Sequence, residues 1–135
     1  MEKKTFKLET QWGETMDVQL DINNYMNNDG LYIGLNCIDE DGDLEPYGDM
    51  TTNLSMKAPD YCAYVDINNM PELEKFIEDN ELGEFTGLTQ RSGYVEYPLY
   101  FFNVNALRKA SPSEMEMYEA RVGNGKMPDN KEKLR

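Results

Sequence analysis

Two neighbouring runs near the start of the chain alternate apolar and polar residues with a period of two. The first run covers residues 5–12 and the second covers residues 15–22. Such alternation is typical of strands with one face in a core and the other in water. An even-length loop between them would place apolar side chains opposite polar ones. We therefore predict a hairpin centred on Glu14, with Trp12 opposite Met16, Leu8 opposite Leu20 and Lys7 opposite Asp21.

Strand patterns dominate the rest of the chain. Apolar, turn-bounded segments predict further strands at residues 31–38, 50–56, 61–67, 85–91 and 94–102, the last two forming a hairpin around Ser92-Gly93. A helical stripe indicates one helix that Asn69 caps and Gly83 ends. Ser111-Pro112-Ser113-Glu114 is a capping box that opens a second helix.

These elements do not alternate regularly between strand and helix. The order predicts an α+β fold, a mainly antiparallel β-sheet packed against one or two short α-helices. We expect a single domain over residues 1–122. Residues 123–135 are rich in Gly, Asn and Lys and lack hydrophobic periodicity, so we expect a flexible polar C-terminal tail there.

Charge and composition exclude several function classes. The net charge is −13 and histidine is absent. Without histidine there is no Ser-His-Asp or Cys-His nucleophile and no histidine zinc site. The first 100 residues carry 21 acidic and 6 basic side chains. Because nucleic acids and anionic membranes need a positive surface, we expect neither as a partner.

The sequence also predicts a compartment. No apolar run approaches the roughly 18–20 residues that span a bilayer. The lysines near Met1 are not followed by an apolar stretch, so we expect no secretory signal. Cys37 and Cys62 lie in apolar, strand-like runs, which favours buried free thiols in a reducing environment. We expect a cytoplasmic protein.

The densest acidic segment is a predicted turn. Its acidic residues are Asp39, Glu40, Asp41, Asp43 and Glu45. The three aspartates match positions 1, 3 and 5 of a calcium loop, but Leu44 and Met50 occupy the positions of the required glycine and glutamate. We therefore predict a solvated turn and no metal site, with weak adventitious divalent binding as the alternative.

A second acidic cluster lies along the first predicted helix and consists of Glu72, Glu78, Asp79 and Glu81, with Glu74 at its margin; Glu74, Glu78 and Glu81 are its candidate partner-binding residues. Such a run is usually the solvated face of an amphipathic helix. Nothing in the spacing selects a pair of carboxylates for acid–base chemistry. Glycine-rich phosphate-binding motifs are also missing from the sequence. We therefore expect no catalytic residue, no cofactor and no enzyme activity.

The hairpin at residues 94–102 is rich in aromatic residues. Base stacking would need an accompanying basic groove, and only Arg91 lies near these rings in the sequence. Core and sheet packing is the better interpretation. Tyr97 and Tyr100 are nevertheless the candidates for an apolar protein-binding surface.

Four strings together resemble a known family. They are Thr10–Glu14, Ala63–Asn69, Leu82–Gly87 preceded by Phe76-Ile77, and Ser92–Tyr94 followed by Tyr97–Tyr100. Their order resembles a family of small bacterial domains of unknown function, encoded on conjugative and phage-like mobile elements of Gram-positive bacteria. The resemblance covers roughly residues 5–120. It implies a genomic context and supplies no catalytic residues.

Two functions remain open at this point. The first is a non-catalytic accessory protein of a mobile element that binds another protein, encoded by the element or by the host. The alternative is a DNA mimic that inhibits a host defence nuclease, of the anti-restriction or anti-CRISPR type, with a basic nuclease as partner. The mimic would act through the acidic clusters, whereas the accessory protein would bind through ordinary apolar and polar contacts, with the aromatic hairpin Tyr94–Phe102 as its candidate surface.

Overall fold

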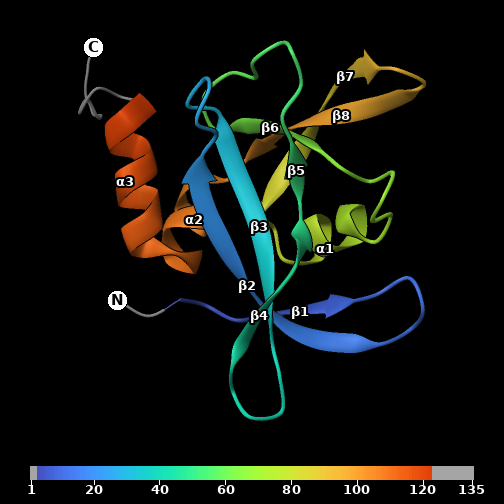
Figure 1. The fold of residues 1–135 in the computed structure, drawn as a ribbon, viewed down its shortest axis with the longest axis vertical. Helices are drawn as coiled ribbons and strands as arrows, with labels where there is room; N and C mark the ends of the chain where they lie inside the picture. The colour runs from blue at the N-terminus through green and yellow to red at the C-terminus, as the bar shows by residue number, and fades with distance from the viewer. Residues whose placement is uncertain (1–2, 123–135) are drawn as a thin grey trace.

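A computed structural model describes residues 3–122 of the 135-residue chain. It consists of two four-stranded antiparallel sheets and three short helices (Figure 1). The predicted α+β class is confirmed, although the strands divide into two sheets. The tail predicted at residues 123–135 lies outside the described residues.

The first sheet contains β1 (Phe6–Glu9), β2 (Thr15–Asn24), β3 (Leu31–Ile38) and β4 (Leu44–Asp49), in that order. Leu8 and Leu20 are fully buried, whereas their neighbours Lys7, Glu9, Gln19 and Asp21 are more exposed, as a period-two pattern requires. β4 escaped prediction because it is mostly exposed, so its sequence shows no apolar alternation.

The first hairpin has the predicted parity but a different register. Leu8 lies opposite Met16 and Lys7 opposite Asp17, so the predicted pairs with Leu20 and Asp21 are wrong. The loop covers residues 10–14, and the Thr10 hydroxyl accepts hydrogen bonds from the amides of Trp12 and Glu14, at 3.3 and 3.2 Å. Because these hydrogen bonds close the loop at Thr10, the turn lies closer to the N-terminus than predicted.

The second sheet has the order β5-β6-β8-β7. Its strands are β5 (Thr51–Thr52), β6 (Cys62–Val65), β7 (Gly83–Ser92) and β8 (Val95–Phe102). The predicted hairpin around Ser92-Gly93 is confirmed, since Ser92 pairs with Val95 across Gly93 and Tyr94. The strands predicted at 50–56 and 61–67 are shorter than expected.

The helices are α1 (Leu73–Asp79), α2 (Val104–Ala110) and α3 (Pro112–Val122). The predicted start of α3 is confirmed, and the Ser111 hydroxyl donates to Glu114 Oε1 at 2.7 Å. Asn69 does not cap α1: its side chain donates to Asp66 Oδ2 at 2.7 Å, within the preceding turn. None of the described helices is long and apolar enough to cross a membrane.

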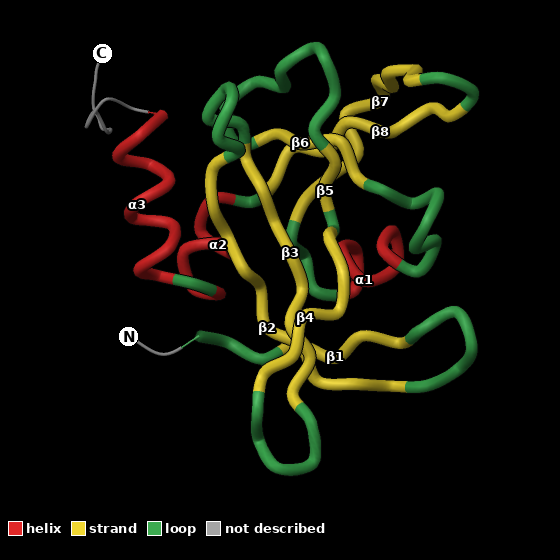
Figure 2. The backbone as a smooth tube through the Cα atoms, viewed as in Figure 1, coloured by secondary structure: helices red, strands yellow, loops and turns green. Residues whose placement is uncertain are grey.

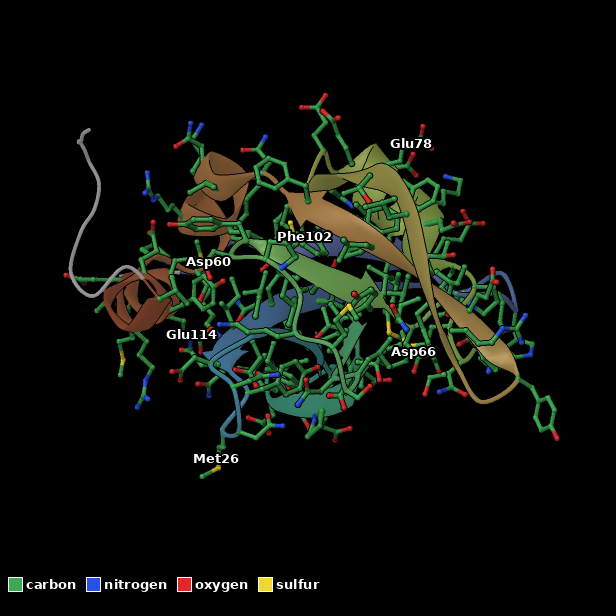
Figure 3. The ribbon with its side chains drawn as sticks, turned by 90° about the horizontal axis from the view of Figure 1, so that it is seen from above. Met26, Asp60, Asp66, Glu78, Phe102 and Glu114 are labelled. Carbon is green, nitrogen blue, oxygen red and sulfur yellow. The ribbon has the colours of Figure 1, made fainter. Side chains whose placement is uncertain are left out.

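One main core joins both sheets and all three helices. Its members include Leu20 and Ile33 of the first sheet, Phe102 of the second, Ile77 of α1 and Tyr118 of α3. In Figure 2, α2 and α3 lie on one side of the long strands β2 and β3, and α1 lies on the other. Figure 3 shows Phe102 in the interior.

Two side chains form hydrogen bonds with backbone groups of β2 beyond the end of β1. β1 pairs with β2 only over residues 15–18. Farther along, Lys3 Nζ donates to the Leu20 carbonyl at 2.8 Å, and the Ile22 amide donates to Glu114 Oε1 at 2.7 Å. Lys3 and Glu114 also form an ion pair of 3.0 Å. Lys3 and Glu114 therefore attach the N-terminal segment and α3 to the same edge of β2.

Candidate functional site

An open groove of about 910 Å³ lies where α1 meets the second sheet. Four glutamates and three aromatic residues contribute to its lining: Glu74, Glu78, Glu81, Glu84, Phe85, Tyr100 and Phe101. The start of α2, from Asn103 to Asn105, forms another wall. We call this cavity the acidic groove.

The packing of α1 explains why its glutamates border the groove. Leu73, Phe76 and Ile77 are buried, so the opposite side of this short helix faces solvent. Residues four apart in a helix lie on one side, which places Glu74 and Glu78 together. Figure 3 shows Glu78 at the periphery of the molecule. Glu81 follows the helix with a φ of 54°, in the left-handed region.

Aromatic rings form the floor of the acidic groove. Phe85 of β7 and Tyr100 of β8 are register partners, with ring centroids 5.8 Å apart. Phe85 is 50% exposed, whereas Tyr100 is 6% exposed. The Tyr100 hydroxyl donates to Glu74 Oε2 at 3.4 Å. Burial, and then the negative charge of Glu74, raises the pKa of Tyr100 to about 12, so its hydroxyl remains a donor at neutral pH.

The groove carboxylates lack cationic partners within residues 3–122. The ion pairs there do not include Glu74, Glu78, Glu81 or Glu84. The one lysine of α1, Lys75, pairs with Asp79 instead. Like charges gathered beside low-dielectric aromatic walls produce a negative potential that attracts cations. The groove is thus suited chemically to basic side chains.

The acidic turn lies elsewhere in the molecule. It forms the tip of the β3–β4 hairpin, away from β7 and β8 (Figure 1). The Asp39 carboxylate accepts hydrogen bonds from the amides of Asp41 and Asp43, at 2.9 and 2.8 Å. The three aspartates each bring a carboxylate oxygen within 4.8 Å of the others. Glu40 is exposed beside them, and Glu45 lies on β4.

Tyr97 and Tyr100 do not form one surface. They lie three positions apart on β8, so their side chains point to opposite faces of the sheet. Tyr97 packs against a small cluster of Cys62, Tyr64 and Leu99. Tyr100 belongs to the main core. The fold therefore places these two rings on separate surfaces of the second sheet.

Several groove residues were missing from the sequence-based set, among them Glu84, Phe85, Phe101 and Asn103. Glu84 and Phe85 lie in the string Leu82–Gly87, where the predicted helix ends at Gly83. The available signal was the predicted strand at 85–91. If that strand pairs with residues 94–102 across Ser92-Gly93, Phe85 falls close to Tyr100.

Comparison with protein families gives one match, described as "Domain of unknown function (DUF4313)", over residues 19–122. The chain belongs to this family. The DUF4313 region contains every residue of the acidic groove and of the acidic turn. The expected membership of a family of unknown function is confirmed. Comparison with curated proteins and with solved structures gives no match.

Proposed function

We propose that this DUF4313 protein is a non-catalytic binding module whose acidic groove receives basic side chains of another protein. The observation that supports this proposal is the set of glutamates without cationic partners within residues 3–122, namely Glu74, Glu78 and Glu81, which line the groove together with the exposed ring of Phe85. Its volume of about 910 Å³ also lies at the upper end of the range for ligand pockets.

The chemistry of the groove favours arginine or lysine over other side chains. A guanidinium or ammonium over an aromatic face gains about 0.5–2 kcal/mol, more when water is excluded. A carboxylate adds a charge-assisted hydrogen bond, and an arginine can engage it through two parallel bonds. Glu74, held by Tyr100, is the most fixed of these carboxylates. Exposed Glu78 and Glu81 would add attraction over a longer range.

We further propose that the protein is a cytoplasmic accessory protein of a mobile element. The support is the sequence resemblance described above. A non-catalytic role is supported by the absence of histidine from the chain. The partner would be a protein of the element or of its host that presents a basic segment.

The second candidate function is mimicry of DNA against a host nuclease. The acidic turn supports it, because three carboxylates converge at a projecting hairpin tip. Duplex DNA carries one charge per about 1.7 Å of axis, so a mimic must present a comparable density of negative charge to the DNA-binding groove of a nuclease. This candidate requires the turn, whereas the first requires the groove.

The peptide acetyl-Arg-Val-Arg-Val-Arg-amide is a suitable probe for the groove. Titration calorimetry would compare the unmodified protein with two variants that each lose three negative charges. The groove variant is E74Q/E78Q/E81Q, and the matched control is D41N/D43N/E45Q at the acidic turn. Both change the net charge equally, so a difference between them reports the location of binding.

We expect the probe to bind with a dissociation constant below about 1 mM, equivalent to about −4 kcal/mol. The groove variant should weaken binding at least tenfold, and the control variant less than about threefold. The acidic peptide acetyl-Glu-Val-Glu-Val-Glu-amide should not bind. Equal losses in both variants would mean that only net charge matters, which contradicts a groove site. A loss confined to the control variant would favour mimicry.

A further inference from the structure

We propose that the partner's basic segment binds as an added antiparallel strand along the free edge of β7. This inference rests on the proposed function of the acidic groove and specifies how its ligand is held. Two neighbouring features support it. One is an exposed strand edge with unused backbone groups, and the other is the groove that borders the same strand.

β7 is the outer strand of its sheet. It pairs with β8 on one side, and within the described part of the chain no strand pairs with its other side. Nearly every residue of this ten-residue strand is exposed. Such an edge is a ready template for another strand. Peptide recognition by strand addition uses edges of this kind.

The register shows which amides of β7 point outward. The Phe102 amide donates to the Tyr61 carbonyl, so Phe102 directs its backbone groups toward β6. Neighbouring residues of a strand direct their backbone amide and carbonyl groups to opposite sides. The backbone groups of Phe101 therefore point toward β7, where they pair with those of Glu84. Gly83 and Phe85, on either side of Glu84, therefore turn their backbone groups to the open edge.

A bulge limits the length of the available edge. Phe85 lies opposite Tyr100, but the next regular pair is Thr89 with Pro98, so three residues of β7 face one residue of β8. The bulge is held by the Thr86 hydroxyl, which donates to the Leu99 carbonyl at 2.8 Å. Gly87 at its centre has a φ of 92°. Bulges terminate regular pairing, so an added strand would be short and centred on Phe85.

The added strand would deliver basic side chains to the groove at alternate positions. A residue opposite Phe85 shares its face of the sheet, and that face also carries Tyr100. Successive side chains of a strand alternate between faces. The segment would therefore place every second residue toward Phe85 and the α1 glutamates. Charge complementarity selects arginine or lysine for those positions.

Antiparallel pairing also determines which backbone amides of the ligand point toward β7. Because Phe85 turns its backbone groups outward, the residue directly opposite must turn its own amide and carbonyl toward Phe85. The same ligand residue points its side chain into the groove. In the probe acetyl-Arg-Val-Arg-Val-Arg-amide, the arginine amides should therefore bond to β7, and the valine amides should face solvent.

Two N-methylated versions of the probe test this assignment. One version carries methyl groups on the backbone amide nitrogens of the arginines, and the other carries them on the backbone amide nitrogens of the valines. We expect arginine methylation to weaken binding at least tenfold and valine methylation to weaken it less than about threefold. Amide hydrogen exchange should also slow at Gly83 and Phe85 in the complex, with no change at Glu84.

The outcomes separate this inference from the proposed function. If the probe binds and E74Q/E78Q/E81Q weakens it, but methylation shows any other pattern and Gly83 and Phe85 exchange as before, the added strand is wrong and the groove site stands. If the unmethylated probe does not bind at all, the groove site is wrong and the added strand fails with it.

Discussion

Glu114 is the side chain whose removal should most weaken the attachment of α3. Its Oε1 accepts from the Ile22 amide and from the Ser111 hydroxyl, both at 2.7 Å, and its carboxylate pairs with Lys3. Hydrogen bonds to a charged group contribute about 1.5–3 kcal/mol, and an unpaired buried amide costs about 1–3 kcal/mol. These contributions overlap, so we expect Glu114→Ala to lower the free energy of unfolding by about 2–4 kcal/mol.

Urea unfolding followed by circular dichroism measures this loss. Glu114→Gln keeps an acceptor oxygen and loses only the charge, so it should cost about 1 kcal/mol. Glu116→Ala, at an exposed position of the same helix, is the control and should change stability by less than about 0.5 kcal/mol. An equally small effect of Glu114→Ala would refute the reasoning.

The Glu114 contribution should also depend on pH. Burial pushes the pKa of Glu114 upward, but the hydrogen bonds from Ile22 and Ser111 and the nearby Lys3 outweigh it, and the pKa is lowered from 4.5. A carboxyl with a depressed folded pKa stabilises the protein above its unfolded pKa. This stability is lost as pH falls through the folded value. The difference between the unmodified protein and Glu114→Ala should therefore narrow below about pH 4.

Three further predictions concern the core, the acidic turn and the surface charge. Tyr118→Phe removes the hydroxyl that accepts from the Tyr61 amide at 3.0 Å, so urea unfolding should show a loss of about 1–3 kcal/mol, and an unchanged midpoint would argue against this bond. Calcium at about 1 mM should leave the melting temperature unchanged, because Leu44 and Met50 occupy the positions where a calcium-binding loop requires glycine and glutamate. A rise of many degrees in the melting temperature would show that the acidic turn is a calcium site. Duplex DNA should form no complex in a gel shift at physiological salt, and saturable binding at micromolar protein would contradict this.

Most strands of this fold could be predicted from periodicity, whereas the exposed strand β4 and the exact pairing of the first hairpin could not. Alternation placed β1, β2 and β3 and required an odd loop in the first hairpin. The register depended on the Thr10 hydroxyl, which closes the loop through amides of Trp12 and Glu14. α2 was missed because it follows β8 after a single residue, Asn103, whose side chain accepts from the Ala106 amide.

The acidic groove could be predicted only in part. The glutamates of α1 were recognised as the solvated face of a helix. Their position beside Phe85 and Tyr100 depends on how α1 packs on the second sheet. Glu74 and Tyr100, which share a hydrogen bond, are 26 positions apart in the sequence. Spacing along the chain carries no information about such a contact. The acidic turn, in contrast, is local, and its residues are together as expected.

The most direct test of the groove is a map of probe binding on the isotope-labelled protein. The backbone amide signals would be followed by nuclear magnetic resonance while acetyl-Arg-Val-Arg-Val-Arg-amide is added. The groove site predicts the largest saturable shifts at Phe85, Tyr100 and Asn103, with little change over residues 39–45. Shifts centred on residues 39–45, with Phe85 and Tyr100 unaffected, would contradict it.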